Sequence, residues 1–201
     1  MTDKIIFATG NENKVKEIRE ILKGSGIEVI TMKEAGIDVD IVEDGKTFEE
    51  NALIKARTVM KAAGFPALAD DSGLSIDALD GAPGIYSARY LGHDTSYDVK
   101  NRHILDELKN VPDEKRGARF TCAMALVLPD AREFVKTGVM EGRIAHDIAG
   151  ANGFGYDPIF FLPEYGKTSA EISPAEKNSI SHRGKALRAM EQVIRELFIP
   201  G

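Results

Sequence analysis

The chain has 201 residues, of which 43% are hydrophobic and 29% are charged. It holds 26 Lys and Arg residues against 32 Asp and Glu residues, so its formal net charge is −6. A net-negative protein is disfavoured as a nonspecific ligand of nucleic acid or of an anionic membrane. The composition is typical of a globular protein, and we expect one domain over residues 1–201.

Cysteine and the amino-terminal residues indicate the compartment. The one cysteine, Cys122, lies in an apolar run and has no second cysteine to pair with, so we expect it to pack as a small hydrophobic residue. This usage fits the reducing cytoplasm. The first residues, MTDKIIFATG, contain too short an apolar stretch for a signal peptide or a membrane span. The four histidines lack the spacing of zinc ligands.

The first predicted elements are a strand, a glycine turn and a helix. Lys4–Ala8 is β-branched and apolar, residues 9–11 form the turn, and helical periodicity continues to about Lys23. This order of elements can hold phosphate through backbone N–H groups at the helix start. However, TGNENK is not a Walker A loop. Lys14 is therefore compatible with either a solvated lysine or a phosphate ligand.

The next elements are a short strand and a well-delimited helix. Glu28–Thr31 is predicted as the strand, and residues 33–46 as an irregular segment. Thr47 and Glu50 match a capping box, and Gly64 follows the helix as its stop signal. Lys55 falls on the apolar stripe of this helix. An inward lysine either extends along the apolar face or meets an anion.

The stretch ADDSGLSIDALDGAPGIYSARY, residues 69–90, is central to the interpretation. We expect a strand to end at Asp70 and Asp71, with Gly73 allowing a tight turn. Two adjacent carboxylates are costly to bury, so a bound cation, a proton or solvent must relieve them. The alternative is a turn with solvated acids.

Four further elements complete a mixed sheet with helices. Residues 96–109 read as a helix, and residues 118–128 as a long strand with alternating side chains. Residues 133–140 should return antiparallel to that strand. Residues 159–162 form another short apolar strand.

The glycine-rich segment AGANGFGY, residues 149–156, precedes this short strand. Phe154 and Tyr156 lie among glycines, where they form either an aromatic plug over the core or a platform for a ligand.

Two helix starts occur near the carboxyl end of the sequence. Ser173, Pro174 and Glu176 match a capping box with proline at the first helical position. His182 and Arg183 open the last helix. Because the helix dipole disfavours cations at this end, they indicate an anionic or electron-rich partner nearby.

Four segments in this order resemble the inosine triphosphate pyrophosphatase family: TGNENK, the stretch at 69–90, GFGYDPIF and SHRGKAL. TFEENALIKA resembles a further family segment. The resemblance covers nearly the whole chain and is weakest at residues 91–117 and 128–150. It implies an α/β fold with an elongated mixed sheet and flanking helices, in two lobes around a nucleotide-binding groove. It also implies homodimers, while the net charge leads us to expect no nucleic acid or membrane as partner.

The implied reaction is the Mg²⁺-dependent hydrolysis of ITP, dITP or XTP to the monophosphate and pyrophosphate, which cleanses the nucleotide pool. By the same resemblance, Asp71 and Lys55 are catalytic, and Glu43 and Asp71 bind the metal. The implied triphosphate residues are Thr9, Gly10, Asn11, Glu12, Asn13 and Lys14. The implied remaining substrate contacts are Ser72, Phe154, Gly155, Tyr156, Asp157, Lys177, His182 and Arg183.

The chemistry of these residues agrees with that reaction. Mg²⁺ prefers carboxylate, phosphate and water oxygens, and a carboxylate beside it can accept a proton from water. Whether Asp71 is a metal ligand, the general base or both stays open. No Ser-His-Asp order or reactive cysteine favours a covalent intermediate, so we expect direct attack by water. The alternative function is a catalytically silent sensor that binds purine nucleotides.

Overall fold

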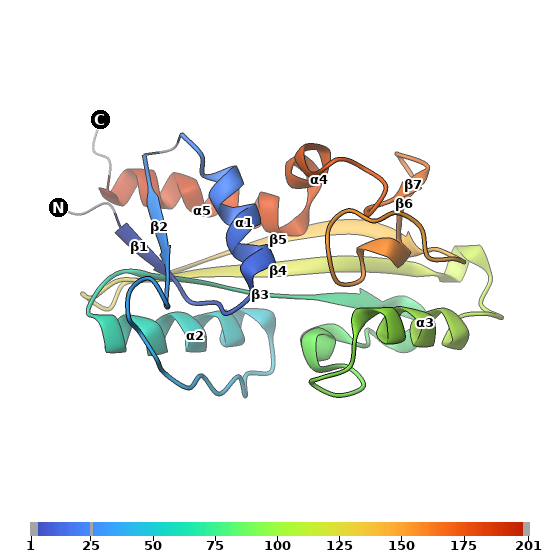
Figure 1. Ribbon diagram of the computed structural model, residues 1–201, viewed down its shortest axis with the longest axis horizontal. Helices are drawn as coiled ribbons and strands as arrows, with labels where there is room; N and C mark the ends of the chain where they lie inside the picture. Colours follow the sequence, from blue (N-terminus) through green and yellow to red (C-terminus); the bar gives the residue numbers. More distant parts are fainter. Residues whose placement is uncertain (1–3, 25, 199–201) are drawn as a thin grey trace. The chain divides into compact units, whose positions relative to one another are not determined.

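The computed structural model describes residues 4–24 and 26–198 and has an α/β fold (Figure 1). Its seven strands form one sheet in the order β2-β1-β3-β4-β5-β6-β7. The strands are β1 (Lys4–Phe7), β2 (Glu28–Thr31), β3 (Ala67–Ile76), β4 (Gly117–Val127), β5 (Glu133–Ile144), β6 (Phe160–Leu162) and β7 (Lys167–Thr168). Strand β1 pairs in parallel with β2 and β3, whereas β6 pairs antiparallel with β5 and β7. The predicted mixed sheet is confirmed.

Local capping signals account for where the helices begin. The helices are α1 (Glu12–Ile21), α2 (Phe48–Ala63), α3 (Tyr97–Glu107), α4 (Pro174–Ile180) and α5 (His182–Phe198). Asn11, Thr47, Ser96 and Ser173 each cap a helix by accepting a backbone N–H with the side chain. At α2 the capping box is shifted, because the Glu50 carboxylate accepts from the N–H of Lys46 rather than from that of Thr47. No helix within the described residues is long and apolar enough to cross a membrane.

The chain divides into two compact units. Unit 1 comprises Met1–Asp71, Cys122–Gly138 and His182–Gly201, and unit 2 comprises Ser72–Thr121 and Val139–Ser181. Strands β3, β4 and β5 contribute residues to both units.

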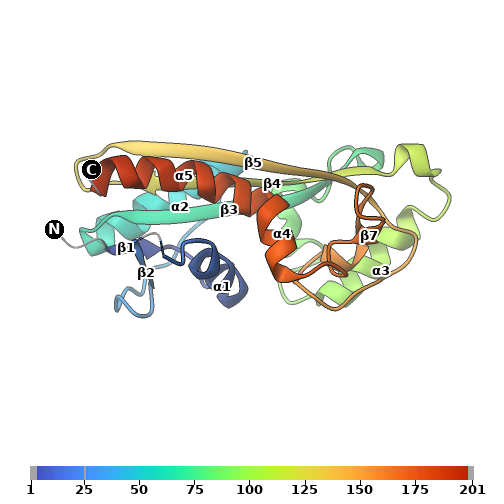
Figure 2. The same ribbon diagram turned by 90° about the horizontal axis from the view of Figure 1, so that it is seen from above.

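In unit 1, helices cover both faces of the sheet. Helices α1 and α5 lie next to each other on one face, and α2 covers the opposite face (Figures 1 and 2). One apolar cluster packs α1 and α5 against β1 and β4, and a second packs α2 against the other side of the same strands. The alternation of β4 serves both clusters: Cys122 and Met124 join the first, whereas Ala123 and Ala125 join the second.

Unit 2 has its own core, built from β3, β4, β5, β6 and α3. Arg116 is almost fully buried at its margin. Its guanidinium donates to the carbonyls of Leu108, at the end of α3, and of Ile144 and Ala145, at the end of β5. Backbone carbonyls thus satisfy a buried charge and join the ends of two elements.

The expectation that a strand ends at Asp70 and Asp71 is wrong. Strand β3 continues to Ile76, so both aspartates and Gly73 lie inside it, and Gly73 makes no turn. Low strand propensity favoured a turn here, but β1 and β4 flank β3 in the sheet and helices bury its residues. The tertiary context therefore overrides the local preference, and consecutive side chains point to opposite faces.

Candidate active site

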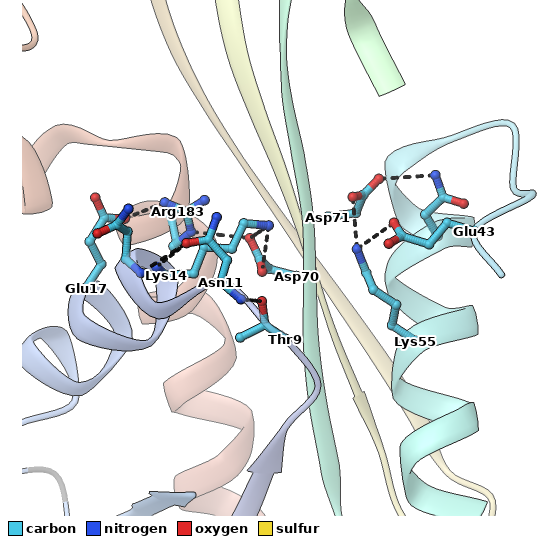
Figure 3. A network of polar contacts seen from close by, with 11 residues as sticks. Thr9, Asn11, Lys14, Glu17, Glu43, Lys55, Asp70, Asp71 and Arg183 are labelled. Atoms are coloured by element: carbon cyan, nitrogen blue, oxygen red, sulfur yellow. Dashed lines mark hydrogen bonds and ion pairs between the residues drawn. The ribbon is translucent and has the colours of Figure 1, made fainter. Parts of the chain in front are cut away.

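Asp70 and Asp71 leave β3 in opposite directions (Figure 3). Asp70 points to the face covered by α1 and α5, and Asp71 points to the face covered by α2. Both aspartates are buried, at 1% and 8% exposure. The strand alternation therefore separates two charges that are adjacent in sequence, and each needs compensation on its own side.

Lys14 and Arg183 compensate Asp70. The ammonium of Lys14 lies 3.0 Å from Asp70 Oδ2, and Arg183 Nε donates to the same oxygen at 3.3 Å. Burial alone would raise the pKa of the Asp70 carboxyl, but these cations outweigh burial and hold the pKa far below its usual range. The cations that relieve Asp70 are thus supplied by the protein itself.

Arg183 is held between two acids at the start of α5. Besides Asp70, its guanidinium contacts the Glu17 carboxylate of α1. Burial lowers the pKa of Arg183, but Asp70 and Glu17 outweigh it, and the pKa stands above its ordinary value. The predicted anionic partner near the start of the last helix is confirmed, and it is a carboxylate pair of the chain itself. The neighbouring His182 is 5% exposed.

The first loop presents a helix start in unit 1. Asn11 Oδ1 accepts from the backbone N–H groups of Asn13 and Lys14, and Thr9 Oγ1 accepts from the N–H of Asn11. Gly10 and Glu12 are exposed. The Asn11 side chain thus serves as the helix cap, while Lys14 turns toward Asp70 (Figure 3).

On the opposite face, one ammonium serves two carboxylates. Lys55 Nζ lies 2.8 Å from Glu43 Oε2 and 3.0 Å from Asp71 Oδ1. Burial lowers the pKa of Lys55, but Asp71, Asp70 and Glu43 outweigh it, so the pKa is raised and the ammonium stays charged. Burial also raises the pKa of Asp71, and the shared ammonium does not cancel that effect. The inward position of Lys55 is confirmed, and it meets an anion.

The pair Glu43 and Asp71 is suited to a divalent cation. Their oxygens already converge on a single cationic centre, the Lys55 ammonium. Within the part of the chain that the structure describes, no group of three or more His, Cys, Asp or Glu side chains could hold a metal ion. Mg²⁺ is commonly bound by one or two carboxylates with waters and substrate phosphates. The two carboxylates therefore fit a Mg²⁺ ion whose other ligands are not protein carboxylates.

Sequence reasoning missed two residues around these aspartates. Asn51, fully buried in α2, donates to Asp71 Oδ2 at 3.2 Å, and Glu17 contacts Arg183. Asn51 lies one helical turn before Lys55, so an amide beside an inward lysine was an available signal. Glu17 reaches a residue far away in the sequence, and no local pattern indicates that contact.

In unit 2, Asp157 organises the residues around Phe154. Its Oδ2 accepts from Lys177 Nζ at 2.6 Å and from the Phe154 N–H at 2.8 Å, while Oδ1 accepts from Ser169 Oγ at 2.8 Å. The Lys177 ammonium also lies 5.1 Å from the centre of the Phe154 ring. Because Asp157 is 2% exposed, the structure uses it to orient Lys177 and Phe154.

The remaining predicted residues of unit 2 differ in their exposure. Tyr156 is 3% exposed, packs edge-on against Tyr97 and donates its hydroxyl to the Ser87 carbonyl, so it is the aromatic plug. The Gly155 carbonyl accepts from Asn101 Nδ2 at 3.1 Å. Phe154 and Ser72 are half-buried. Of the two aromatic side chains, only Phe154 keeps an accessible ring for a ligand.

Comparisons with known proteins agree over nearly the whole chain. The sequence model of the Ham1 family matches residues 5–193. A dITP/XTP pyrophosphatase of Clostridium perfringens is 48% identical over 201 residues, covering 97% of this chain and 98% of that protein. A second, from Escherichia coli O157:H7, is 46% identical over 194 residues, covering 96% and 98%. A solved HAM1 protein from Coxiella burnetii is 44% identical with a TM-score of 0.87, covering 96% of this chain and 98% of that one.

Proposed function

Because this chain belongs to the Ham1 family, we propose that it hydrolyses non-standard purine nucleoside triphosphates. The substrates are ITP, dITP and XTP, and the products are the nucleoside monophosphate and pyrophosphate. Relatives that share 46–48% of their residues with the chain are named dITP/XTP pyrophosphatases. The observation that carries the proposal is the pair of carboxylates, Asp71 and Glu43, that converge on one cation beside β3.

Asp71 is the proposed general base. A water molecule attacks the α-phosphorus, its proton passes to Asp71, and the bond from the α-phosphorus to the bridging oxygen breaks to release pyrophosphate. Burial raises the pKa of Asp71, which makes it a better proton acceptor than an ordinary aspartate. Bound at Glu43 and Asp71, Mg²⁺ would polarise the phosphoryl oxygens and lower the pKa of a water ligand.

Lys55 and Lys14 are proposed to act on the triphosphate. Lys55 lies between the two proposed metal ligands, so a bound triphosphate can take over the ammonium once Mg²⁺ occupies the carboxylates. Lys14 follows the start of α1, where Gly10 and Glu12 are exposed and the positive end of the helix dipole is suited to phosphate oxygens. These lysines supply positive charge where the leaving pyrophosphate gains negative charge.

The proposed purine contacts are the residues that the family resemblance implies. Phe154 offers a stacking face, with the Lys177 ammonium beside it. Ser72, Gly155, Tyr156 and Asp157 shape the surroundings, and His182 and Arg183 are the proposed donors toward a 6-oxo purine. A site built from donors accepts an oxo group and disfavours the amino group of adenine.

Product analysis tests the proposed function. The purified chain is incubated with ITP and Mg²⁺, and the products are separated by chromatography alongside a pyrophosphate assay. We expect IMP and pyrophosphate in equal amounts, and no turnover in excess EDTA. The release of IDP and orthophosphate would contradict the assignment, and ITP binding without turnover would indicate the silent sensor instead.

A homodimer in the cytoplasm is the proposed state of the chain. Four large apolar side chains between residues 86 and 99 are well exposed: Tyr86, Leu91, Tyr97 and Val99. The family resemblance implies the homodimer, and we propose that a second copy of the chain covers these side chains. Light scattering at micromolar concentration should give twice the mass of the 21.9 kDa chain. A monomer mass would contradict this part of the proposal.

A further inference from the structure

We propose that Asn51 is the residue that positions both acids of the magnesium site. This inference rests on the proposed function, because it concerns the site formed by Glu43 and Asp71. Asn51 lies in the second turn of α2, and no part of it is exposed to solvent. A fully buried amide is costly unless its donor and its acceptor are both used, so its partners define its role.

The orientation of the Asn51 amide is determined by its partners. Its Oδ1 accepts from the Gly45 backbone N–H at 2.9 Å, and its Nδ2 donates to Asp71 Oδ2 at 3.2 Å. A backbone N–H can only donate and a carboxylate at neutral pH only accepts, so the reversed amide would lose both bonds. The amide therefore links the segment that carries Glu43 to the strand that carries Asp71.

The link to Gly45 is a close one. A Cβ atom at residue 45 would lie 2.6 Å from Asn51 Oδ1 and 2.8 Å from Glu50 Cβ, which no ordinary side chain tolerates. The next residue is also attached to α2, because the Lys46 N–H donates to Glu50 Oε2 at 2.6 Å. The N–H groups of Gly45 and Lys46 thus hold these two residues against α2. Glu43 lies two residues before Gly45.

The two carboxylate oxygens of Asp71 have different partners. Asn51 holds Oδ2, while Oδ1 faces the Lys55 ammonium at 3.0 Å. Lys55 comes one helical turn after Asn51 and also contacts Glu43. A neutral donor on Oδ2 fixes the carboxylate without adding a charge that would compete with a cation. Such partners of metal-binding carboxylates are worth about 10- to 100-fold in metal affinity or activity.

The test is direct Mn²⁺ binding without nucleotide, measured by electron paramagnetic resonance on the wild type, Asn51→Leu and Asn51→Ser. Leucine has the same branched heavy-atom skeleton as asparagine and makes neither bond, whereas serine is too short to reach both partners. Thr58→Val is the control, because the Thr58 hydroxyl lies on the same helix and bonds only to the Ile54 carbonyl. Circular dichroism selects a temperature at which every variant is folded.

We expect both Asn51 variants to bind Mn²⁺ about 10- to 100-fold more weakly than wild type, with Thr58→Val unchanged. In turnover assays the Mg²⁺ requirement should rise by a similar factor, while the KM for ITP at saturating Mg²⁺ stays within about threefold. Wild-type Mn²⁺ affinity in both folded Asn51 variants would overturn the inference, even if they melt earlier. A wild type that releases pyrophosphate but does not bind Mn²⁺ without nucleotide would also overturn the inference. A wild type that does neither would contradict the proposed function itself.

Discussion

The two faces of β3 treat consecutive aspartates in opposite ways. On one face, Lys14 and Arg183 both contact Asp70, and its pKa is held far below the usual range. On the other face, Asp71 and Glu43 share the Lys55 ammonium, and burial raises the pKa of Asp71. A carboxylate that is fully compensated stabilises the fold, whereas one that is only partly compensated can still accept a proton or a metal. Asp70 is therefore held as a structural carboxylate, whereas Asp71 has the environment that its proposed role as a base requires.

The largest expected effect is on turnover in Asp71→Asn. This variant keeps the shape but removes the proposed base, so kcat should fall by about 10²- to 10⁴-fold. Its melting temperature should not fall, because burial raises the pKa of Asp71 and the ionised form therefore costs stability at neutral pH. Steady-state kinetics at saturating Mg²⁺ checks the loss of turnover, and a thermal melt checks the stability. Wild-type turnover would remove Asp71 from the chemistry.

Asp70→Asn should show the opposite pattern. Removing this carboxylate leaves Lys14 and Arg183 without their shared partner, and breaking a buried pair costs about 3–5 kcal/mol of unfolding free energy. Because folding lowers the pKa of Asp70, its ionised form stabilises the protein above the unfolded pKa of about 3.9, and this contribution declines as the pH falls further. Urea unfolding of the wild type and of Asp70→Asn should therefore show a difference in unfolding free energy that is constant near neutral pH and becomes smaller below about pH 4.

An Asp70→Asn variant as stable as the wild type at every pH would contradict the structural role of Asp70. Asp130→Asn is a suitable control, because Asp130 also pairs with an arginine, Arg132, but on the surface. Surface pairs contribute little, so this control should unfold as the wild type does.

Lys55→Met should have a smaller effect on stability, and it tests the face on which Glu43 and Asp71 share the Lys55 ammonium. Methionine keeps an apolar stem but leaves Glu43 and Asp71 without a cation, so the unfolding free energy in EDTA should fall by about 1–3 kcal/mol. Mg²⁺ should then raise the melting temperature of the variant more than that of the wild type, because the metal replaces the lost charge. Melts with and without Mg²⁺ measure this, and an equal response in both proteins would argue against a metal at these carboxylates.

The smallest expected effect concerns the choice between purine bases. It tests whether Arg183, which contacts Asp70, has a role beyond structure. If Arg183 also donates to a 6-oxo purine, Arg183→Ala should narrow the ratio of kcat/KM for ITP over ATP by about tenfold, the value of one charge-assisted hydrogen bond. Phe154→Ala is the comparison, since stacking serves any purine and both substrates should lose similarly. An unchanged ratio in Arg183→Ala would leave the arginine as a partner of Asp70 and Glu17.

Sequence reasoning succeeded where the signal was local. The caps at Thr47 and Ser173 marked helix starts, because a cap and its partner lie within three residues of each other. The stripe of α2 likewise placed Lys55 inward. Asp70 shows where that reasoning ends: its partners Lys14 and Arg183 lie 56 and 113 residues away along the chain. Only the packing of α1 and α5 on one face of the sheet brings them together.

The same limit explains the error at Gly73. A run of Asp, Asp, Ser and Gly has low strand propensity, and nothing within the run shows that it lies inside a strand of a seven-stranded sheet. The run itself therefore does not reveal that the two aspartates point to opposite faces of a strand. Asn51 escaped notice for a related reason, since its two partners come from a loop and from a strand outside its helix.

The position of Cys122 provides a reporter of native-state opening. This thiol has no exposed surface and belongs to the cluster beneath α1 and α5, and burial raises its pKa to about 12. Only the thiolate reacts with alkylating reagents, so the folded protein should resist them and need no reductant in storage. Modification then occurs only in molecules whose α1 and α5 face has opened. The chain has no other cysteine. The rate at which iodoacetamide increases the protein's mass therefore measures how often this face opens, without any engineered label.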